Sequence, residues 1–449
     1  MKVLHVPFCY YPDPVGGTEV YVASLARVQR ARGYDVGIAA PDEATRSYSH
    51  DGFAIHRFGT APKMDLRQLY GEGDPAAAAN FARVLDRVQP DLLHLHAFTS
   101  AVSAGLAHVA RARGIPVVFT YHTPTVTCCR GTMLERGTRV CDGEMRVHRC
   151  AACMLDGKQL PGAASRLLGS LPESVGRFAG HAGLEGGMWT ALRSTELVGV
   201  RHASARRFLC EETSHVFAVC EWVRSVLVAN GVPPGKITLS RQGLPYPVTS
   251  AHACARAASR PLRLAFLGRL DPVKGLDVLI DALATIPHVD LQLDVFAVVQ
   301  TEAARRREAA LIEQLRTDRR IQLVAPLDAA DVVERLKDYD ALVVPSQWLE
   351  SGPLVVYEAF AAGIPVVGTN LGGIAELVRD GETGLLVEPR SIAAWAATIQ
   401  RLFDEPELLR RLKASPKPVR TAEDAADDAA RVYGALLNPA ASVAGANRL

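Results

Sequence analysis

The chain has 449 residues, of which 48% are hydrophobic and 22% charged, a composition that excludes disorder and allows two domains with separate cores. Its 50 basic and 48 acidic residues leave a net charge of +2, so charge alone does not favour nucleic-acid binding or attachment to a membrane surface. No window approaches the roughly 18 apolar residues of a transmembrane segment, and the first apolar run is too short for a signal peptide, so we expect a cytoplasmic protein.

The N-terminal region begins as a strand, a helix and a second strand. Val3 to Val6 has the apolar pattern of a strand, and a helix is predicted from Thr18. Gly16 and Gly17 fall in the turn between them, where missing side chains let backbone N–H groups and the positive helix end approach an anion. An ordinary turn is the alternative interpretation.

Two predicted strands further along the chain end in histidines. The strand from residue 91 to residue 95 carries His94 and is followed by His96, and the strand from residue 116 to residue 120 is followed by His122. Ligands of open α/β sheets bind at the carboxyl ends of the strands, which makes His122 a candidate functional residue. We expect His94 and His96 to be structural, with contact to an acceptor as the alternative for His96.

A cysteine-rich segment follows His122 and does not fit regular α/β structure. Cys128, Cys141, Cys150 and Cys153 include one C-x2-C pair, and four thiolates suit a closed tetrahedral zinc site that holds together an insertion of about residues 124–187. Cys129 or His148 are substitute ligands. Separate buried thiols and a redox-active pair are the alternatives. The odd total of nine cysteines does not suit a secreted disulfide framework.

The polar, Ala-rich run from residue 247 to residue 260 reads as a linker. It predicts domains at residues 1–255 and 256–415, followed by a helix at 416–440. After the first strand of the second domain, G-R-L-D-P-V-K-G places Arg269 and Lys274 beside a helix start. Two such cations suit a diphosphate whose negative charge grows as a bond to it breaks. Solvated loop cations are the alternative.

The segment from residue 343 to residue 388 contains two carboxylates eight residues apart. Glu350 lies in a predicted loop after a strand, and Glu358 lies in the helix that begins near Leu354. That helical separation spans roughly 12 Å, about what is needed to reach two ends of a nucleotide sugar. Gly372 and Gly373 repeat the glycine turn before another helix. Two unrelated surface glutamates are the alternative.

Together these motifs resemble, in order and spacing, the retaining glycosyltransferases of family 4, with their E-x7-E signature. The resemblance implies an α/β GT-B fold, in which two Rossmann-like domains face each other across a cleft and the C-terminal helix crosses back to the first domain. It also implies transfer of a hexosyl group from a UDP- or GDP-sugar to a hydroxyl of a small-molecule, glycan or lipid-linked acceptor, with retained configuration. Nucleic acid is not an expected partner.

The resemblance also implies roles for individual residues. It places His122 near the reacting carbon, Glu350 at the donor sugar and Glu358 at the ribose. The implied catalytic residues are His122, Arg269, Lys274 and Glu350. The implied donor-binding residues are Gly16, Gly17, Arg269, Lys274, Glu350, Leu354, Glu358, Gly372 and Gly373.

We expect no catalytic metal, because the D-x-D sequence from Asp338 to Asp340 precedes a strand and so lies at the wrong end of the sheet for a ligand. The only predicted cofactor is therefore structural zinc at the cysteines. Two alternative functions remain from the sequence. The first is another GT-B nucleotide-sugar enzyme, an epimerase or a hydrolase, and the second is a non-catalytic sugar-nucleotide sensor switched by its cysteine module.

Overall fold

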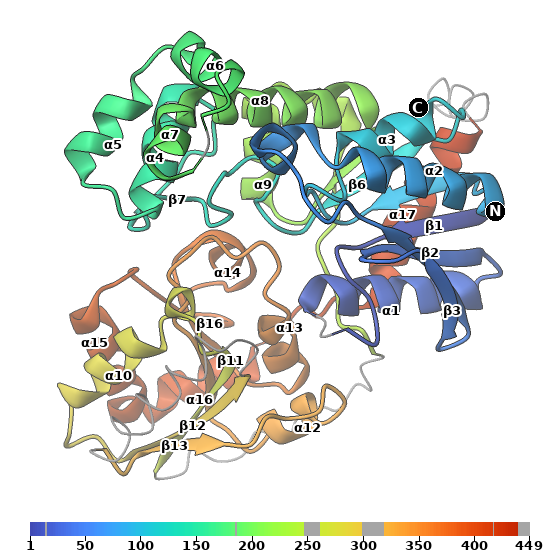
Figure 1. The fold of residues 1–449 in the computed structure, drawn as a ribbon. Helices are drawn as coiled ribbons and strands as arrows, with labels where there is room; N and C mark the ends of the chain where they lie inside the picture. Colours follow the sequence, from blue (N-terminus) through green and yellow to red (C-terminus); the bar gives the residue numbers. More distant parts are fainter. Residues whose placement is uncertain (14–15, 185, 247–260, 299–317, 416, 439–449) are drawn as a thin grey trace. The chain divides into compact units, whose positions relative to one another are not determined.

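The computed structural model describes residues 1–13, 16–184, 186–246, 261–298, 318–415 and 417–438, and they form two compact units (Figure 1). The first unit consists of Met1–Arg241 and the chain from Glu423 onward, and the second consists of Gln242–Ala422. The predicted linker from residue 247 to residue 260 lies outside the described residues. In this part of the chain, no helix combines the length and the apolar character that crossing a membrane requires.

The first unit is built on a sheet with the strand order β10-β9-β6-β5-β1-β2-β4-β3. All neighbouring strands are parallel except β3, which runs antiparallel to β4. The strands are β1 (Lys2–Val6), β2 (Asp35–Asp42), β3 (Arg46–His50), β4 (Phe53–Gly59), β5 (Leu92–Leu95), β6 (Val117–Tyr121), β9 (His215–Ala218) and β10 (Ile237–Leu239).

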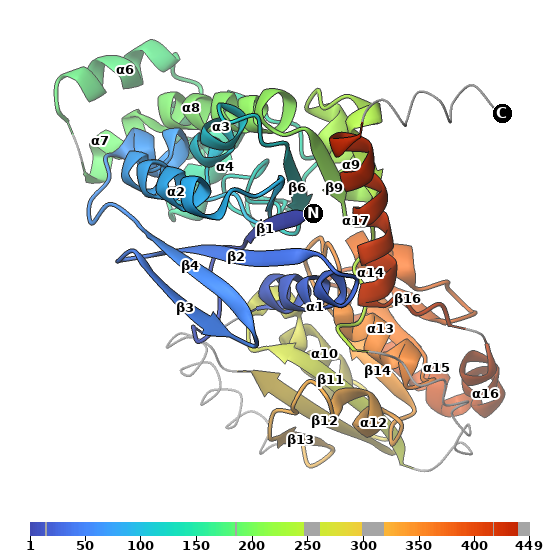
Figure 2. The ribbon, with the colours of Figure 1, turned by 90° about the vertical axis from the view of Figure 1, so that its right-hand side faces the viewer.

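Helices cover both faces of this sheet, which is why its central strands are apolar on both sides. The first face packs against α2, α3, η2 and α9, and the second against α1 and α17. Figure 2 shows α17 beside the sheet of this unit. The helices are α1 (Gly17–Ala31), η1 (Gln68–Glu72), α2 (Pro75–Val88), α3 (Ala104–Arg111), α8 (Ser194–Arg206), η2 (Arg207–Glu212), α9 (Glu221–Ala229), η3 (Pro234–Lys236) and α17 (Ala422–Leu437).

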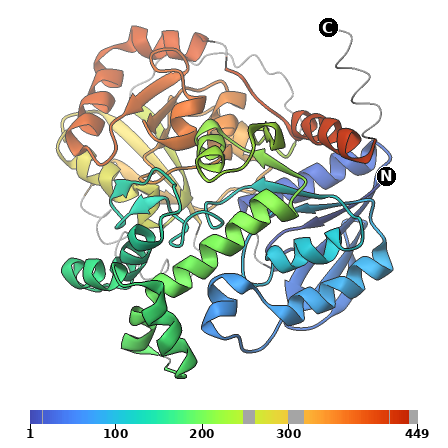
Figure 3. The ribbon, with the colours of Figure 1, turned by 90° about the horizontal axis from the view of Figure 1, so that it is seen from above.

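Between β6 and β9 the chain forms an insertion of short elements, drawn in green in Figure 3. The part from residue 162 to residue 181 is mostly helical. The elements are β7 (Leu134–Glu135), β8 (Arg139–Val140), α4 (Val147–Gly157), α5 (Gly162–Gly169), α6 (Glu173–His181) and α7 (Gly187–Leu192). The strands β7 and β8 pair as a small antiparallel hairpin.

The second unit contains a fully parallel sheet with the order β13-β12-β11-β14-β15-β16. In sequence order this is 3-2-1-4-5-6, the arrangement of a Rossmann domain. The strands are β11 (Leu262–Arg269), β12 (Leu291–Val298), β13 (Ile321–Val324), β14 (Ala341–Val344), β15 (Val366–Thr369) and β16 (Gly384–Val387). The prediction of two Rossmann-like domains is confirmed.

Two apolar clusters hold the helices of the second unit against its sheet. One includes α10, α15 and α16, and the other includes α12, α13 and α14, so the sheet is again covered on both faces. The elements are η4 (Pro272–Lys274), α10 (Leu276–Ala284), α12 (Val332–Leu336), α13 (Leu354–Ala361), α14 (Gly372–Leu377), α15 (Ile392–Asp404) and α16 (Pro406–Ala414).

The D-x-D sequence before β14 has a structural role in the second unit. Asp340 is buried, accepts a hydrogen bond from the backbone N–H of Arg263 at 2.9 Å and pairs with the Nζ of Lys413 at 2.7 Å. The side chains of Asp340 and Lys413 are only 2% and 5% exposed, so each charge depends on the other for compensation.

Replacing Asp340 by alanine leaves the buried Lys413 unpaired, and we expect a loss of about 3–5 kcal/mol in the free energy of unfolding. Denaturant unfolding of the purified variant measures this loss. Asp338→Ala is the matched control, because Asp338 pairs with Arg335 at the surface and its removal should cost less than about 1 kcal/mol. Equal losses in the two variants would contradict the structural role of Asp340.

Candidate active site

In the second unit, the predicted functional residues gather where the strand order of the sheet reverses. The strands β11 and β14 are neighbours there, although β12 and β13 lie between them in the sequence. Arg269 is the last residue of β11, Lys274 ends the short helix η4 that follows, and Glu350 lies in the loop after β14. In open α/β sheets this position is the usual ligand site.

The loop that carries Lys274 lies directly on the chain that follows β14. The carboxylate of Asp271 caps η4 by accepting the N–H of Val273 at 3.1 Å. The N–H of Gln347 donates to the carbonyl of Val273 at 2.7 Å. Gly275 has a φ of +70°, and a Cβ there would lie 1.9 Å from the carbonyl oxygen of Pro345. Glycine is therefore required for the two loops to pack together.

This packing brings Lys274 and Glu350 into a buried ion pair. Lys274 Nζ lies 2.6 Å from Glu350 Oε1, and the hydroxyl of Ser346 donates to the same oxygen at 2.9 Å. Burial alone would raise the pKa of Glu350, but the charge and hydrogen bond of Lys274 outweigh it and lower the pKa below its usual value. Glu350 is therefore an anion at neutral pH, and it holds the ammonium group in place.

Gly372 and Gly373 support Glu350 through its backbone. The N–H of Gly373 donates to the carbonyl of Glu350 at 2.7 Å. A Cβ at Gly372 would lie 3.0 Å from the backbone of Glu350, and one at Gly373 would lie 2.8 Å from its carbonyl oxygen. The glycine pair at the start of α14 thus has a packing role in addition to the predicted contact with phosphate.

The second glutamate has a different environment. Glu358 lies on α13, one helical turn after Leu354 and on the same side of the helix. The hydroxyl of Tyr246 donates to Glu358 Oε1 at 3.4 Å. Burial raises the pKa of Glu358 to about 7, against a smaller lowering by Tyr246. Tyr246 lies directly before the predicted linker, and no sequence motif distinguishes it.

Arg269 differs from Lys274 in exposure. Its side chain is at the surface, at the end of β11, and no described residue forms an ion pair with it. Of the two predicted phosphate-binding cations, Lys274 is therefore held by an internal partner, whereas Arg269 presents its guanidinium group to solvent.

In the first unit, three histidines form a hydrogen-bonded chain at the carboxyl ends of β1, β5 and β6. His122 Nε2 lies 3.1 Å from His96 Nδ1, and His96 Nε2 lies 2.9 Å from His5 Nδ1. His5 Nε2 lies 2.8 Å from the side-chain carbonyl oxygen of Gln29. Burial lowers the pKa of His5 to about 4 and that of His122 to about 3, so the rings are neutral at pH 7.

The direction of these hydrogen bonds follows from Gln29. A carbonyl oxygen only accepts, so His5 donates through Nε2 and accepts at Nδ1. His96 then donates through Nε2 to His5 and accepts at Nδ1 from His122. This leaves His122 protonated at Nε2, with a lone pair at Nδ1. Its tautomer is thus determined by a residue two histidines away.

His94 is engaged in the core, as expected for a structural residue. Its Nδ1 lies 2.5 Å from the hydroxyl of Tyr433 on α17, and its Nε2 lies 2.7 Å from the hydroxyl of Thr120. Nitrogens of His5, His94 and His96 lie within 4.8 Å of one another, close enough for a metal site. These nitrogens already have hydrogen-bond partners, so the three histidines form a hydrogen-bond network rather than an open set of metal ligands.

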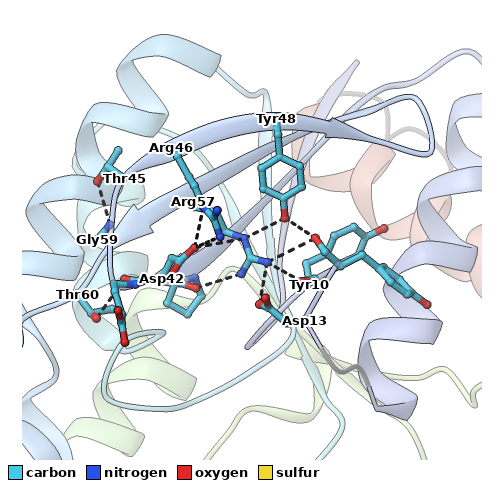
Figure 4. Close-up of polar contacts among 12 residues, drawn as sticks. Tyr10, Asp13, Asp42, Thr45, Arg46, Tyr48, Arg57, Gly59 and Thr60 are labelled. Carbon is cyan, nitrogen blue, oxygen red and sulfur yellow. Dashed lines mark hydrogen bonds and ion pairs between the residues drawn. The ribbon is translucent and has the colours of Figure 1, made fainter.

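A buried arginine anchors the loop that leads to Gly16 and Gly17 (Figure 4). Arg57, on β4, is 1% exposed, donates to the carbonyl of Tyr10 at 2.5 Å and pairs with Asp13 at 2.8 Å. Among the described residues, the only other carboxylate paired with its guanidinium group is that of Asp42, at 4.0 Å. Arg57 was not identified from the sequence, since a lone arginine in a strand carries no motif.

The predicted glycine pair begins α1. The N–H of Gly16 donates to Glu19 Oε2 at 2.9 Å, which closes a cap over the first turn. Both glycines are exposed, and a Cβ at Gly17 would meet nothing within 4 Å. Internal packing therefore does not explain glycine at position 17, whereas the close approach of a ligand would.

The predicted metal ligands Cys128, Cys141, Cys150 and Cys153 line one cavity of the first unit, together with Cys129. The substitute ligand His148 is not among the lining residues. Its Nδ1 lies 3.0 Å from the carbonyl oxygen of Gly169 instead.

Solved structures identify the class of this fold. The chain aligns with the sucrose-phosphate synthase of Thermosynechococcus elongatus at a TM-score of 0.66 and 20% identity, over 98% of this chain and 100% of that one. It also aligns with Alr3699/HepE of Anabaena in complex with UDP at a TM-score of 0.61 and 15% identity, over 99% and 100% of the chains. The fold is that of the GT-B glycosyltransferases.

Sequence comparison narrows this class. A model for glycosyltransferase family 4 matches residues 15–149, and a model for glycosyl transferases group 1 matches residues 252–417. The chain is therefore a GT-B glycosyltransferase of group 1, with a family-4-like N-terminal domain. The D-inositol 3-phosphate glycosyltransferase of Arthrobacter sp. (strain FB24) is 27% identical over 411 residues, 87% of this chain and 82% of that protein. That of Mycobacterium sp. (strain KMS) is 37% identical over 164 residues, 35% of this chain and 37% of that protein.

The neutral histidine chain predicts loss of stability in acid. The unfolded-state pKa of histidine is about 6.5, and the folded-state values of His5 and His122 are about 4 and about 3. Between these pH values the unfolded chain binds more protons than the folded protein. The two buried neutral histidines therefore contribute fully to stability above pH 6.5, and this contribution is lost as the pH falls. We expect the free energy of unfolding to decrease between about pH 6.5 and 4.

Denaturant unfolding at a series of pH values measures this decrease. His122→Asn should make the decrease smaller, because one buried neutral histidine is removed. His181→Asn is the control, since His181 is exposed on α6, and it should leave the pH dependence unchanged. A flat pH profile of the unmodified protein would contradict the interpretation.

Proposed function

We propose that this protein is a retaining glycosyltransferase that moves a hexosyl group from a UDP- or GDP-sugar to an acceptor hydroxyl. The observation that carries the proposal is the meeting of Arg269, Lys274 and Glu350 at the point where the strand order of the second unit reverses. Support comes from structural neighbours described with nucleotides, namely HepE of Anabaena with UDP and starch synthase IV of Arabidopsis thaliana with ADP and acarbose.

In the proposed reaction, Lys274 and Arg269 stabilise the departing diphosphate. Its negative charge grows as the bond to the sugar breaks, so cations held in advance stabilise the transition state more than the bound donor. Glu350 provides this preorganisation for Lys274 through the contact of 2.6 Å. Arg269 adds a planar guanidinium group that can bind two phosphate oxygens at once.

The two glutamates take different parts of the donor. Glu358 accepts hydrogen bonds from the ribose hydroxyls, with Leu354 on the same side of α13. Glu350 contacts the sugar, and Gly372 and Gly373 hold its backbone in place. Gly16 and Gly17 approach the diphosphate from the start of α1, and His122 lies near the reacting carbon of the sugar.

Retention is proposed to proceed by attack on the same face of the sugar. A two-step route needs a carboxylate free to act as nucleophile, whereas Glu350 is paired with Lys274. The bond between the anomeric carbon and the phosphate oxygen breaks, and a bond to the acceptor oxygen forms on the side that the phosphate leaves. The acceptor proton passes to an oxygen of the departing phosphate, so the step uses no catalytic metal.

A donor screen followed by a turnover assay tests the function. Nucleotide sugars that bind the folded protein raise its melting temperature, and the best donor is then assayed with candidate acceptors. Lys274→Ala should lower kcat/KM by roughly 10²–10³-fold, and NMR of the product should show the anomeric configuration of the donor. Lys337→Ala is the control, because Lys337 is a surface lysine paired with Glu334.

Three results would count against the proposal. Unchanged turnover in Lys274→Ala, with the fold verified by circular dichroism, would remove the assigned role of Lys274. Product formation without any acceptor would indicate an epimerase or a hydrolase, and binding without turnover of any donor would indicate a sensor.

The pKa of Glu358 predicts how activity depends on pH. Below about pH 7 the side chain is protonated and accepts ribose hydroxyls less well, so kcat/KM should rise as the pH increases through about 7. Tyr246→Phe removes a hydrogen bond that lowers this pKa, and should shift the rise to higher pH. Glu358→Gln should abolish the rise, and an unchanged profile in that variant would assign it to another group.

A further inference from the structure

The insertion between β6 and β9 has a small apolar cluster of its own. This cluster contains three buried residues, Ala151 and Met154 on α4 and Val198 on α8. Met133 and Leu134, before and in β7, are buried as well, whereas both residues of β8 are exposed. Small segments of this kind usually need a metal or a disulfide to hold one conformation.

Five cysteines surround one small cavity in this insertion. They come from the turn after β6, from the end of the β7–β8 hairpin and from α4, and they are Cys128, Cys129, Cys141, Cys150 and Cys153. Cys150 and Cys153 are three residues apart on α4, so they share one side of the helix. The cavity has a volume of about 30 Å³, enough for a single small ion or a water molecule.

We propose that Cys128, Cys141, Cys150 and Cys153 bind one zinc ion, which holds the turn, the hairpin and α4 together. All four thiols are free in the structure. Four thiolates in tetrahedral geometry form a closed site of the structural kind, with no open position for substrate. The proposal does not depend on the donor site of the second unit.

Two of these sulfurs accept backbone hydrogen bonds. The N–H of Gly143 donates to Cys141 Sγ at 3.5 Å, and the N–H of Arg136 donates to Cys153 Sγ at 3.3 Å. The thiol of Cys153 also donates to the carbonyl of Leu134 at 3.9 Å. Metal binding would remove that proton, whereas the two N–H contacts suit a metal-bound thiolate.

Charged residues of both signs line the cavity, namely Arg130, Arg149, Glu135 and Glu144. Arg149 pairs with Asp142 at 2.5 Å, yet its buried Nε has no hydrogen-bond acceptor in the described part of the chain. A thiolate sulfur drawn toward the ion would offer one. The two arginines would then offset part of the net charge of −2 that zinc carries with four thiolates.

Cys129 follows Cys128 in the chain and lines the same cavity. It packs against the apolar cluster of Ala151, Met154 and Val198, as Cys150 also does. Cys129 is therefore the substitute for Cys128 in the ligand set, and the two cysteines are compared directly in the test.

Binding requires the sulfurs to move closer together. With a Zn–S distance of about 2.3 Å, tetrahedral geometry places neighbouring sulfurs about 3.8 Å apart. In the described residues, no three of these sulfurs lie within 4.8 Å of one another. The ion would therefore turn the side chains inward, and in doing so draw three otherwise weakly packed segments together.

Metal analysis of the purified full-length protein tests the proposal. We expect about one zinc per chain, retained through gel filtration. Each of Cys128→Ser, Cys141→Ser, Cys150→Ser and Cys153→Ser should lower the zinc content severalfold. Cys210→Ser is the control, because Cys210 does not line the cavity, and it should leave the zinc content unchanged. A larger loss in Cys129→Ser than in Cys128→Ser, or an equal loss in Cys210→Ser, would overturn the ligand assignment.

A second measurement covers the case in which the serine variants fail to fold. The unmodified protein is stripped of metal under reducing conditions and titrated with Co²⁺, which should give thiolate-to-cobalt charge-transfer absorption that saturates at about one equivalent. Absence of both zinc and cobalt binding, disulfides in the intact mass, or iron–sulfur absorption would each overturn the proposal. Donor turnover is a separate readout, so failure of the zinc site leaves the proposed function standing.

Discussion

The ion pair of Lys274 and Glu350 is the interaction on which the candidate site of the second unit depends. A lysine and a glutamate 2.6 Å apart in a largely buried position are costly to desolvate, and they persist because the backbone around them is held tightly. Gly275 lets one loop lie against the carbonyl of Pro345, and Gly373 holds the other loop by a hydrogen bond to Glu350. The loops after β11, β14 and β15 thus position one ion pair.

In the first unit, buried side chains are also positioned by one another, through hydrogen bonds between neutral rings rather than through an ion pair. The chain from Gln29 through His5 and His96 to His122 is buried, so each ring is neutral and has one donor and one acceptor nitrogen. A single amide oxygen at one end therefore orders the whole chain. The order set by this oxygen extends to His122, which donates through Nε2 to His96.

Much of the fold and part of the candidate site could be predicted from local sequence. The glycine turns, the two cations after β11 and the E-x7-E spacing each lie within a few residues, so their order along the chain reveals them. Tyr246, Gln29 and Arg57 could not be found in this way, because each acts on residues brought near it by the sheet: Glu358, His5 and the loop before Gly16.

What the sequence by itself determined was the class of fold, and it predicted that the candidate residues gather at one edge of a sheet, because alternating strands and helices place the carboxyl ends of parallel strands on the same edge. Only the tertiary structure decided how those residues differ. The neighbour of each carboxylate is a matter of packing: Glu350 meets Lys274 and is ionised, whereas Glu358 meets Tyr246 and titrates near neutrality. Burial and charge in space, which no spacing encodes, set these differences.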